Sequence, residues 1–139
     1  MENVVFDAIK RRVMEEPYAK KLGLKLVKLD YGYSLVEMVF SEDMENIFGM
    51  AHGGAIFSLL DEAFETAANS YGTVSVALSM NVNYIRPPTK GETLFAEAKE
   101  IHKSNRVGTY SIEVKDSTGG LIAVCQALVY RKKDPLPFL

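Results

Sequence analysis

The sequence has few of the residues that mark disulfide scaffolds, zinc sites or nucleic-acid binders. It contains one cysteine, Cys125, and only two histidines, His52 and His102. Neither an internal disulfide nor a zinc site of ordinary composition is therefore expected. Lys and Arg total 16 against 18 Asp and Glu, for a net charge of -2, and no stretch forms the basic stripe that binds phosphate backbones. We expect no bound metal and no nucleic-acid partner.

Long apolar runs are also missing. No stretch reaches the about 18 apolar residues that a membrane-spanning helix requires, and the apolar residues near the N-terminus are interrupted by the basic residues 10–12. We read residues 1–16 as an amphipathic helix and not as a targeting segment. A protein that does not enter a membrane and resides in a reducing cytoplasm fits these features. The 139 residues suit a single domain over 1–139, ending in a polar, solvated tail at 131–139.

Alternating apolar positions and turn residues predict six strands. A strand at 24–30 and a second at 33–40 flank the turn Tyr31-Gly32 and form a hairpin. Residues 41–51 lack periodicity and are expected to form a loop. Four further strands are expected at 73–85, 93–101, 107–115 and 121–130, and we predict that these four consecutive strands form an antiparallel meander.

One long helix is expected at 55–70. Five apolar residues recur there at spacings of three and four, which places them on one face: Ile56, Leu60, Ala63, Phe64 and Ala67. Four polar residues fall on the opposite face: Ser58, Glu62, Glu65 and Asn69. Asp61 lies at the border between the faces, where its carboxylate is partly removed from water. The chain is therefore expected to be an α+β protein, with one antiparallel sheet curled around one helix.

The residues immediately before this helix suggest an anion site. His52 is followed by Gly53 and Gly54, and the first turn of a helix offers free N–H groups to an oxyanion. The competing interpretation is that the two glycines only form a tight corner between loop and helix. Signatures of serine hydrolases and of nucleotide-binding loops are absent from the sequence. Cys125 lies in the most apolar strand and reads as a buried structural thiol.

Residues 46–61, NIFGMAHGGAIFSLLD, resemble a family signature. They are similar to the N-x-x-G-x-x-H-G-G-x-x-x-x-L-x-D motif of hotdog-fold acyl-CoA thioesterases of the phenylacetate-degradation (PaaI) type. The resemblance extends through 83–87 and 91–94 and covers about 18–131. It implies a hotdog fold of five to six strands around the central helix. It also implies homodimers whose sites are shared between subunits, paired into homotetramers.

The resemblance implies roles for individual residues. Asp61 would act as general base for water or as nucleophile on the thioester carbonyl, and the Gly53 N–H would polarise that carbonyl. Asn46 and His52 match positions that orient the carbonyl, the water or the loop. Some members of the family place a serine or threonine hydroxyl on the strand after the helix. In this sequence it corresponds to Ser75, to Ser79 or to neither, and Ser79 is taken as the candidate.

The substrate implied by the resemblance is an acyl-CoA, so coenzyme A enters as part of the substrate and no separate cofactor is expected. Gly54 and Phe57 are further candidate substrate contacts beside the motif. Three cations at strand ends are candidates for the phosphates of CoA: Arg86, Lys90 and Arg106. Each could equally be an ordinary solvated charge. The two loops that carry them fall at opposite ends of one strand, so only a dimer would bring them close.

Two other functions compete with thioester hydrolysis. Hydratases on the same fold carry other motifs such as H-F-P, which this sequence lacks. A non-catalytic acyl-CoA-binding hotdog protein would not need a carboxylate at position 61. The acyl group stays open between aryl or arylacetyl and medium-chain, since Phe48, Met50, Phe57, Phe64 and Tyr84 suit either.

Overall fold

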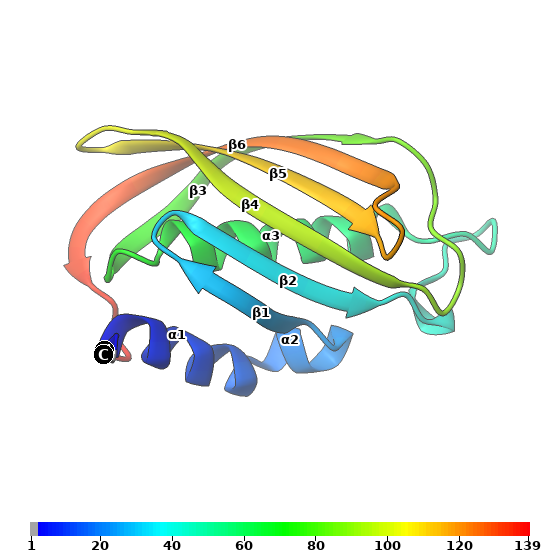
Figure 1. Ribbon diagram of the computed structural model, residues 1–139, viewed down its shortest axis with the longest axis horizontal. Coiled ribbons are helices and arrows are strands. Elements are labelled where there is room, and N and C mark those ends of the chain that lie inside the picture. The colour runs from blue at the N-terminus through cyan, green and yellow to red at the C-terminus, as the bar shows by residue number, and fades with distance from the viewer. Residues whose placement is uncertain (1–2) are drawn as a thin grey trace.

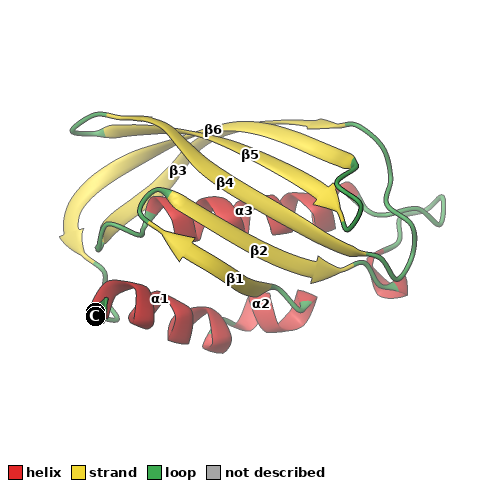
Figure 2. Ribbon diagram, in the orientation of Figure 1, coloured by secondary structure: helices red, strands yellow, loops and turns green. Residues whose placement is uncertain are grey.

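The computed structural model describes residues 3–139, and its six strands form one antiparallel sheet in the order β1-β2-β4-β5-β6-β3. Figure 2 shows this sheet as one strongly curled layer with the helices on its inner side and along one edge. The strands are β1 (Lys25–Asp30), β2 (Tyr33–Val39), β3 (Thr73–Tyr84), β4 (Thr93–Lys103), β5 (Val107–Asp116) and β6 (Leu121–Pro135). The predicted α+β hotdog architecture is confirmed.

Helix α3 (Gly53–Ala68) lies along the concave face of the sheet (Figure 1). Its apolar stripe supplies the centre of the core, where Leu59, Leu60 and Ala63 are fully buried. Phe64 packs its ring edge against Tyr110 of β5, with the ring centroids 5.5 Å apart. Removing a large side chain at such a position costs about 2–5 kcal/mol of stability. The helix begins two residues earlier than predicted, because His52 provides its N-cap.

The pairing partner of β3 differs from the prediction. β4, β5 and β6 form the expected meander, but β3 pairs with β6 instead of β4 and occupies an edge of the sheet. The reason lies in the connection after β3, which contains Pro87 and Pro88. These residues cannot form a tight hairpin, so the chain crosses to the far side of β5 and β6 before β4 begins.

The helix predicted over 1–16 is observed, and a second helix follows it in a segment where none was predicted. Residues 1 and 2 lie outside the described part of the chain, α1 spans Val4–Glu15, and α2 spans Pro17–Leu22. Pro17 suits the first position of α2 because proline needs no N–H partner there. Figure 1 shows both helices running below β1. None of the helices within residues 3–139 has the length and apolar character needed to cross a membrane.

These two helices overturn part of the predicted exposure of α3. Ser58 and Glu62 were expected on a solvated face, but they are only 9% and 4% exposed. The Tyr18 hydroxyl of α2 lies 2.8 Å from the Ser58 hydroxyl and covers this side of the helix. Helical periodicity identified the polar side correctly, but it did not reveal that another element packs on it.

The C-terminal residues are also more ordered than predicted. The expected tail over 131–139 is solvent-exposed at most positions, but it is not a free tail, because β6 continues to Pro135 and pairs there with Thr73 of β3. Leu136 follows with 5% exposure and belongs to the hydrophobic core. β3 is long enough to pair with this segment and so keeps it on the sheet. No local pattern in the C-terminal sequence indicates this pairing.

Candidate active site

The loop before α3 is organised by Asn46. Its side-chain oxygen accepts the backbone N–H groups of Phe48 at 2.8 Å and of Met50 at 3.1 Å. Its amide donates to the Ala51 carbonyl at 3.5 Å. The loop therefore closes on itself around one side chain, as the bridge between Glu45 and Ala51 also shows. Asn46 positions the residues that lead into the helix.

His52 caps the helix with its imidazole. The Nδ1 atom accepts the Gly54 N–H at 2.8 Å, so the lone pair is on Nδ1 and the ring proton is on Nε2. This bond occupies the Gly54 N–H. The N–H of Gly53, the first residue of α3, has no partner within the helix, and no cap or loop acceptor among residues 3–139 binds it. Gly53, and not Gly54, is thus the available donor.

Tyr84 covers Gly53 from the end of β3. Its hydroxyl donates to the Gly53 carbonyl at 3.1 Å, and a Cβ added to Gly53 would lie 3.3 Å from its ring. The close contact between ring and backbone leaves little room for a side chain at position 53. From the sequence, Tyr84 is only a candidate pocket residue, because nothing local indicates its contact with a glycine 31 residues away.

Asp61 lies in the middle of α3 and is half-buried. It lines a cavity of about 150 Å³ together with Phe64, Glu65, Ala68, Ser75, Ala77 and Val129. Burial, and in second place the negative charge of Glu16, raise the pKa of the Asp61 carboxyl above its ordinary value. A carboxylate that holds its proton more strongly is a better base when it is ionised. Glu16 was not among the predicted site residues, because it lies 45 positions earlier.

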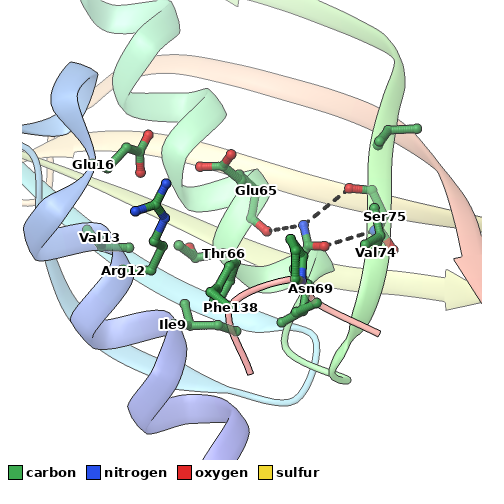
Figure 3. A pocket seen from close by; sticks show the side chains of 13 residues that line it. Ile9, Arg12, Val13, Glu16, Glu65, Thr66, Asn69, Val74, Ser75 and Phe138 are labelled. Carbon is green, nitrogen blue, oxygen red and sulfur yellow. Dashed lines mark hydrogen bonds between the residues drawn. The ribbon is translucent and has the colours of Figure 1, made fainter. Parts of the chain in front are cut away.

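A second, larger cavity adjoins the one around Asp61. Its volume is about 410 Å³, it lies between α1, α3, β3 and the C-terminal residues, and it shares Glu65 and Ser75 with the smaller cavity. Figure 3 shows Ile9, Val13, Val74 and Phe138 among the side chains at its walls, with Arg12, Glu16 and Glu65 at one end. None of these residues was predicted to belong to the site.

Of the two candidate hydroxyls on β3, that of Ser75 lines the cavity that holds Asp61. The pairing of β3 with β6 shifts register between Ala77 and Ser79. Ser75 and Ala77 line the Asp61 cavity, whereas Ser79 follows the shift and does not. Within one chain, Ser79 is exposed and separate from the carboxylate. Phe57 lies one turn before Asp61 on α3 and is half-buried.

The three candidate cations have different surroundings. Arg86 forms an ion pair with Asp116, whose carboxylate is buried and also accepts the Thr118 hydroxyl and the Gly120 N–H. These bonds hold the pKa of Asp116 well below its usual range. Lys90 lies 3.7 Å from Glu42 with its side chain largely exposed. Arg106 is exposed in the turn between β4 and β5.

One chain does not bring the predicted catalytic residues together. Asn46, His52 and Gly53 gather at the start of α3, but Asp61 follows Gly53 by eight residues, or about 12 Å along the axis. Both groups cannot address one carbonyl carbon from the same helix. Cys125 is 5% exposed in β6, and burial raises the pKa of its thiol, as expected for a structural cysteine.

The sequence matches known proteins over the region that holds these groups. A family model described as thioesterase superfamily matches residues 48–123. A protein of Archaeoglobus fulgidus named as an esterase is 40% identical over 116 residues, which make up 84% of this chain and 75% of that protein. The acyl-coenzyme A thioesterase PaaI of Escherichia coli is 34% identical over 113 residues, 81% of each chain.

The fold matches a solved structure as well. The E. coli PaaI protein from the phenylacetic acid degradation operon superposes with a TM-score of 0.86 at 30% sequence identity, over 94% of this chain and 98% of that one. The chain described here is therefore similar to an acyl-CoA thioesterase in sequence over about four fifths of each chain, and in fold over nearly the full length of each.

Proposed function

The chain belongs to the thioesterase superfamily and is an acyl-CoA thioesterase, and from this premise we propose that it hydrolyses aryl- or arylacetyl-CoA, with medium-chain acyl-CoA as the alternative. The observation that carries the proposal is the half-buried Asp61, whose raised pKa suits a base and which lines a cavity that adjoins a larger one with largely apolar walls. The name of the E. coli relative, from a phenylacetic acid degradation operon, supports the aryl preference.

The proposed chemistry uses one carboxylate and one backbone donor. Asp61 takes a proton from water as the water oxygen attacks the thioester carbonyl, and the Gly53 N–H binds the oxygen that becomes negative. The C–S bond then breaks, and the CoA sulfur leaves and receives the proton. In the alternative, the Asp61 carboxylate attacks the carbonyl itself, the C–S bond breaks and the CoA thiolate leaves and takes up a proton, and water then hydrolyses the resulting mixed anhydride to the free acid. His52 and Asn46 position the Gly53 N–H in both routes.

We propose that each site lies between two subunits. Edge strand β3 exposes Val76, Leu78 and Tyr84, although its sequence alternates as cleanly as that of a buried strand. A long apolar edge favours pairing with a second copy, and two-fold symmetry is the commonest closure. Two α3 helices side by side and antiparallel would bring Asp61 of one subunit to Gly53 of its partner. Pairing of such dimers into tetramers is proposed from the family resemblance.

The acyl group is proposed to occupy the cavity of about 410 Å³ beside Asp61. Its size lies near the lower end of ordinary ligand pockets, and this favours a compact acyl group over a long chain. Lys90 and Arg106 remain candidates for the CoA phosphates, as does Ser79 for a partner's site. Arg86 already has a buried partner in Asp116, so its proposed phosphate contact would require that pair to open.

Hydrolysis of an acyl-CoA panel tests this proposal. Free CoA thiol is measured for phenylacetyl-, benzoyl-, hexanoyl-, decanoyl- and palmitoyl-CoA, with Asp61→Asn as the inactive reference. The highest kcat/KM is expected for the aryl thioesters. A preference for palmitoyl-CoA would contradict the compact pocket, and binding without release of thiol would favour a non-catalytic acyl-CoA protein. A cytoplasmic location is proposed from the single buried cysteine.

A further inference from the structure

Three carboxylates converge where the N-terminal helices meet the central helix. Glu16 lies between α1 and α2, and Glu62 and Glu65 lie three residues apart on α3, so they share a face. One carboxylate oxygen from each lies within 4.8 Å of the other two. Figure 3 shows Glu16 and Glu65 pointing toward one another at one end of the larger cavity. We call this group the Glu16 cluster.

Glu62 makes the cluster unlike a set of surface acids. Its side chain is 4% exposed, and its Oε2 atom is buried without a hydrogen-bond partner among residues 3–139. Buried carboxylate oxygens are normally hydrogen-bonded, paired with a cation or bound to a metal. Burial first, and then the neighbouring Glu16 and Glu65, raise the pKa of Glu62 far above its ordinary value.

The nearest basic side chain does not neutralise the cluster. Arg12 lies beside Glu16 at the wall of the larger cavity, but its ion pair, at 3.9 Å, is with Glu15. No ion pair within residues 3–139 joins Glu16, Glu62 or Glu65 to a lysine or arginine. The buried carboxylate of Glu62 therefore relies on bound protons or on a cation from solution to offset its charge.

We propose that Glu16, Glu62 and Glu65 form a binding site for one hard divalent cation of the Mg²⁺, Mn²⁺ and Ca²⁺ class. Carboxylate oxygens are the ligands that these ions prefer, and the set contains no sulfur or imidazole that would select zinc. The cation takes the unpartnered Oε2 of Glu62 as a ligand and displaces the proton that Glu62 otherwise holds, which passes to the buffer. Because Glu16 belongs to the N-terminal helices, the ion fastens them to α3 one turn from Asp61.

Thermal unfolding and calorimetry with MnCl₂, MgCl₂ and CaCl₂ test the site without any reference to catalysis. At about ten times its Kd, at least one of these ions should raise the Tm of the wild-type protein by about 3–6 °C. Titration in two buffers of different ionisation enthalpy should show proton release on binding. Glu62→Gln should abolish both effects, while Glu113→Gln, a half-buried glutamate on β5, should keep them.

Glu16→Gln provides a second test if Glu62→Gln fails to fold, because Glu16 is less buried, and it should weaken binding at least tenfold. Absence of a Tm shift with all three ions would overturn the proposal and leave protons as the neutralising species. An unchanged shift in both cluster variants would also overturn it, by placing the ion elsewhere. Neither result would bear on the thioesterase activity, since the readout is binding alone.

Discussion

The two halves of α3 handle their polar groups in opposite ways. At the start of the helix, His52 accepts the Gly54 N–H, Asn46 closes the preceding loop, and Tyr84 binds the Gly53 carbonyl. In the middle of the helix, Asp61, Glu62 and Glu65 lie close together, and each has a raised pKa in which burial is the leading cause. The start of the helix is held by hydrogen bonds that leave the Gly53 N–H available, whereas the middle gathers carboxylates that are unfavourable to ionise.

This difference matches the two tasks of a thioesterase site. A donor that stabilises a developing oxyanion works best when its surroundings are fixed in advance, so that binding requires no reorganisation. A base needs the reverse, namely an environment that makes its ionised form less stable. Local conflicts of this kind are expected at functional sites and are unusual elsewhere in a fold.

Removing the Asp61 carboxylate from the middle of α3 should have the largest effect on activity. Asp61→Asn is expected to lower kcat by about 10²–10⁴-fold, the usual contribution of a positioned acid or base. The similar shape of asparagine should preserve the circular dichroism spectrum and the Tm. Glu113→Gln serves as the control and should retain full activity. Wild-type turnover in Asp61→Asn would exclude the proposed mechanism.

Blocking the Gly53 N–H at the start of α3 should have the next largest effect on activity. Gly53→Val places a branched side chain where a single Cβ already meets the Tyr84 ring at 3.3 Å. Loss of access to the N–H is expected to reduce kcat by about 10²-fold, as for other oxyanion donors. Tyr84→Phe keeps the ring and removes only the bond to the Gly53 carbonyl, so it should retain most of the activity. Equal losses in both variants would point to the Tyr84 hydroxyl instead.

Removing the cap should affect stability and activity together. His52→Ala leaves the Gly54 N–H without its acceptor, which is expected to cost about 0.5–2 kcal/mol in the free energy of unfolding. The displaced Gly53 N–H should lower kcat by about 10-fold or more. His52→Asn restores a good capping residue and should recover the stability in urea unfolding. Failure of asparagine to restore stability would mean that His52 does more than cap.

The smallest expected effect is a shift in the pH dependence of activity, which tests how the charges in the middle of α3 act on Asp61. As a base, Asp61 must be ionised, so kcat/KM should fall as the pH drops through its raised pKa. The charge of Glu16 contributes to that rise, and Glu16→Gln should therefore move the acidic limb to lower pH while Glu62, Glu65 and Arg12 remain in place. The limb should stay fixed in Glu113→Gln. An unmoved limb in Glu16→Gln would show that Glu16 does not act on Asp61.

Local sequence patterns predicted most of the helices and strands, but they did not predict which element packs or pairs with which. The alternation of β3 and the apolar stripe of α3 depend on the pleat and on the helical turn, which act over a few residues. The partner of β3 depends instead on a crossing of the chain around Pro87 and Pro88, and strand order is not encoded in alternation. Leu136 belongs to the core for a similar reason. It directly follows the part of β6 that pairs with β3, and the local sequence does not reveal that pairing.

The candidate site residues divide in the same way, into those that a local motif indicates and those that only the fold brings together. Asn46, His52, Gly53 and Asp61 could be named as candidates from the sequence because they form one contiguous motif. Glu16 and the walls of the larger cavity were missed, because they reach α3 only after the N-terminal helices fold onto it. Ser79 was named from the family resemblance, with Ser75 left open, and the register shift after Ala77 could not be read from the sequence. Ser75, the open alternative, is the residue that lines the cavity.

The most direct test of a site shared between subunits combines two inactive chains. An Asp61→Asn chain and a Gly53→Val chain are dissociated, mixed in equal amounts and reassociated, and mixing is verified by mass spectrometry. Half of the dimers should then be mixed, and each should hold one intact site of two, so about a quarter of the wild-type kcat should return. No recovery of activity in verified mixed dimers would contradict a site built from Asp61 of one subunit and Gly53 of the other.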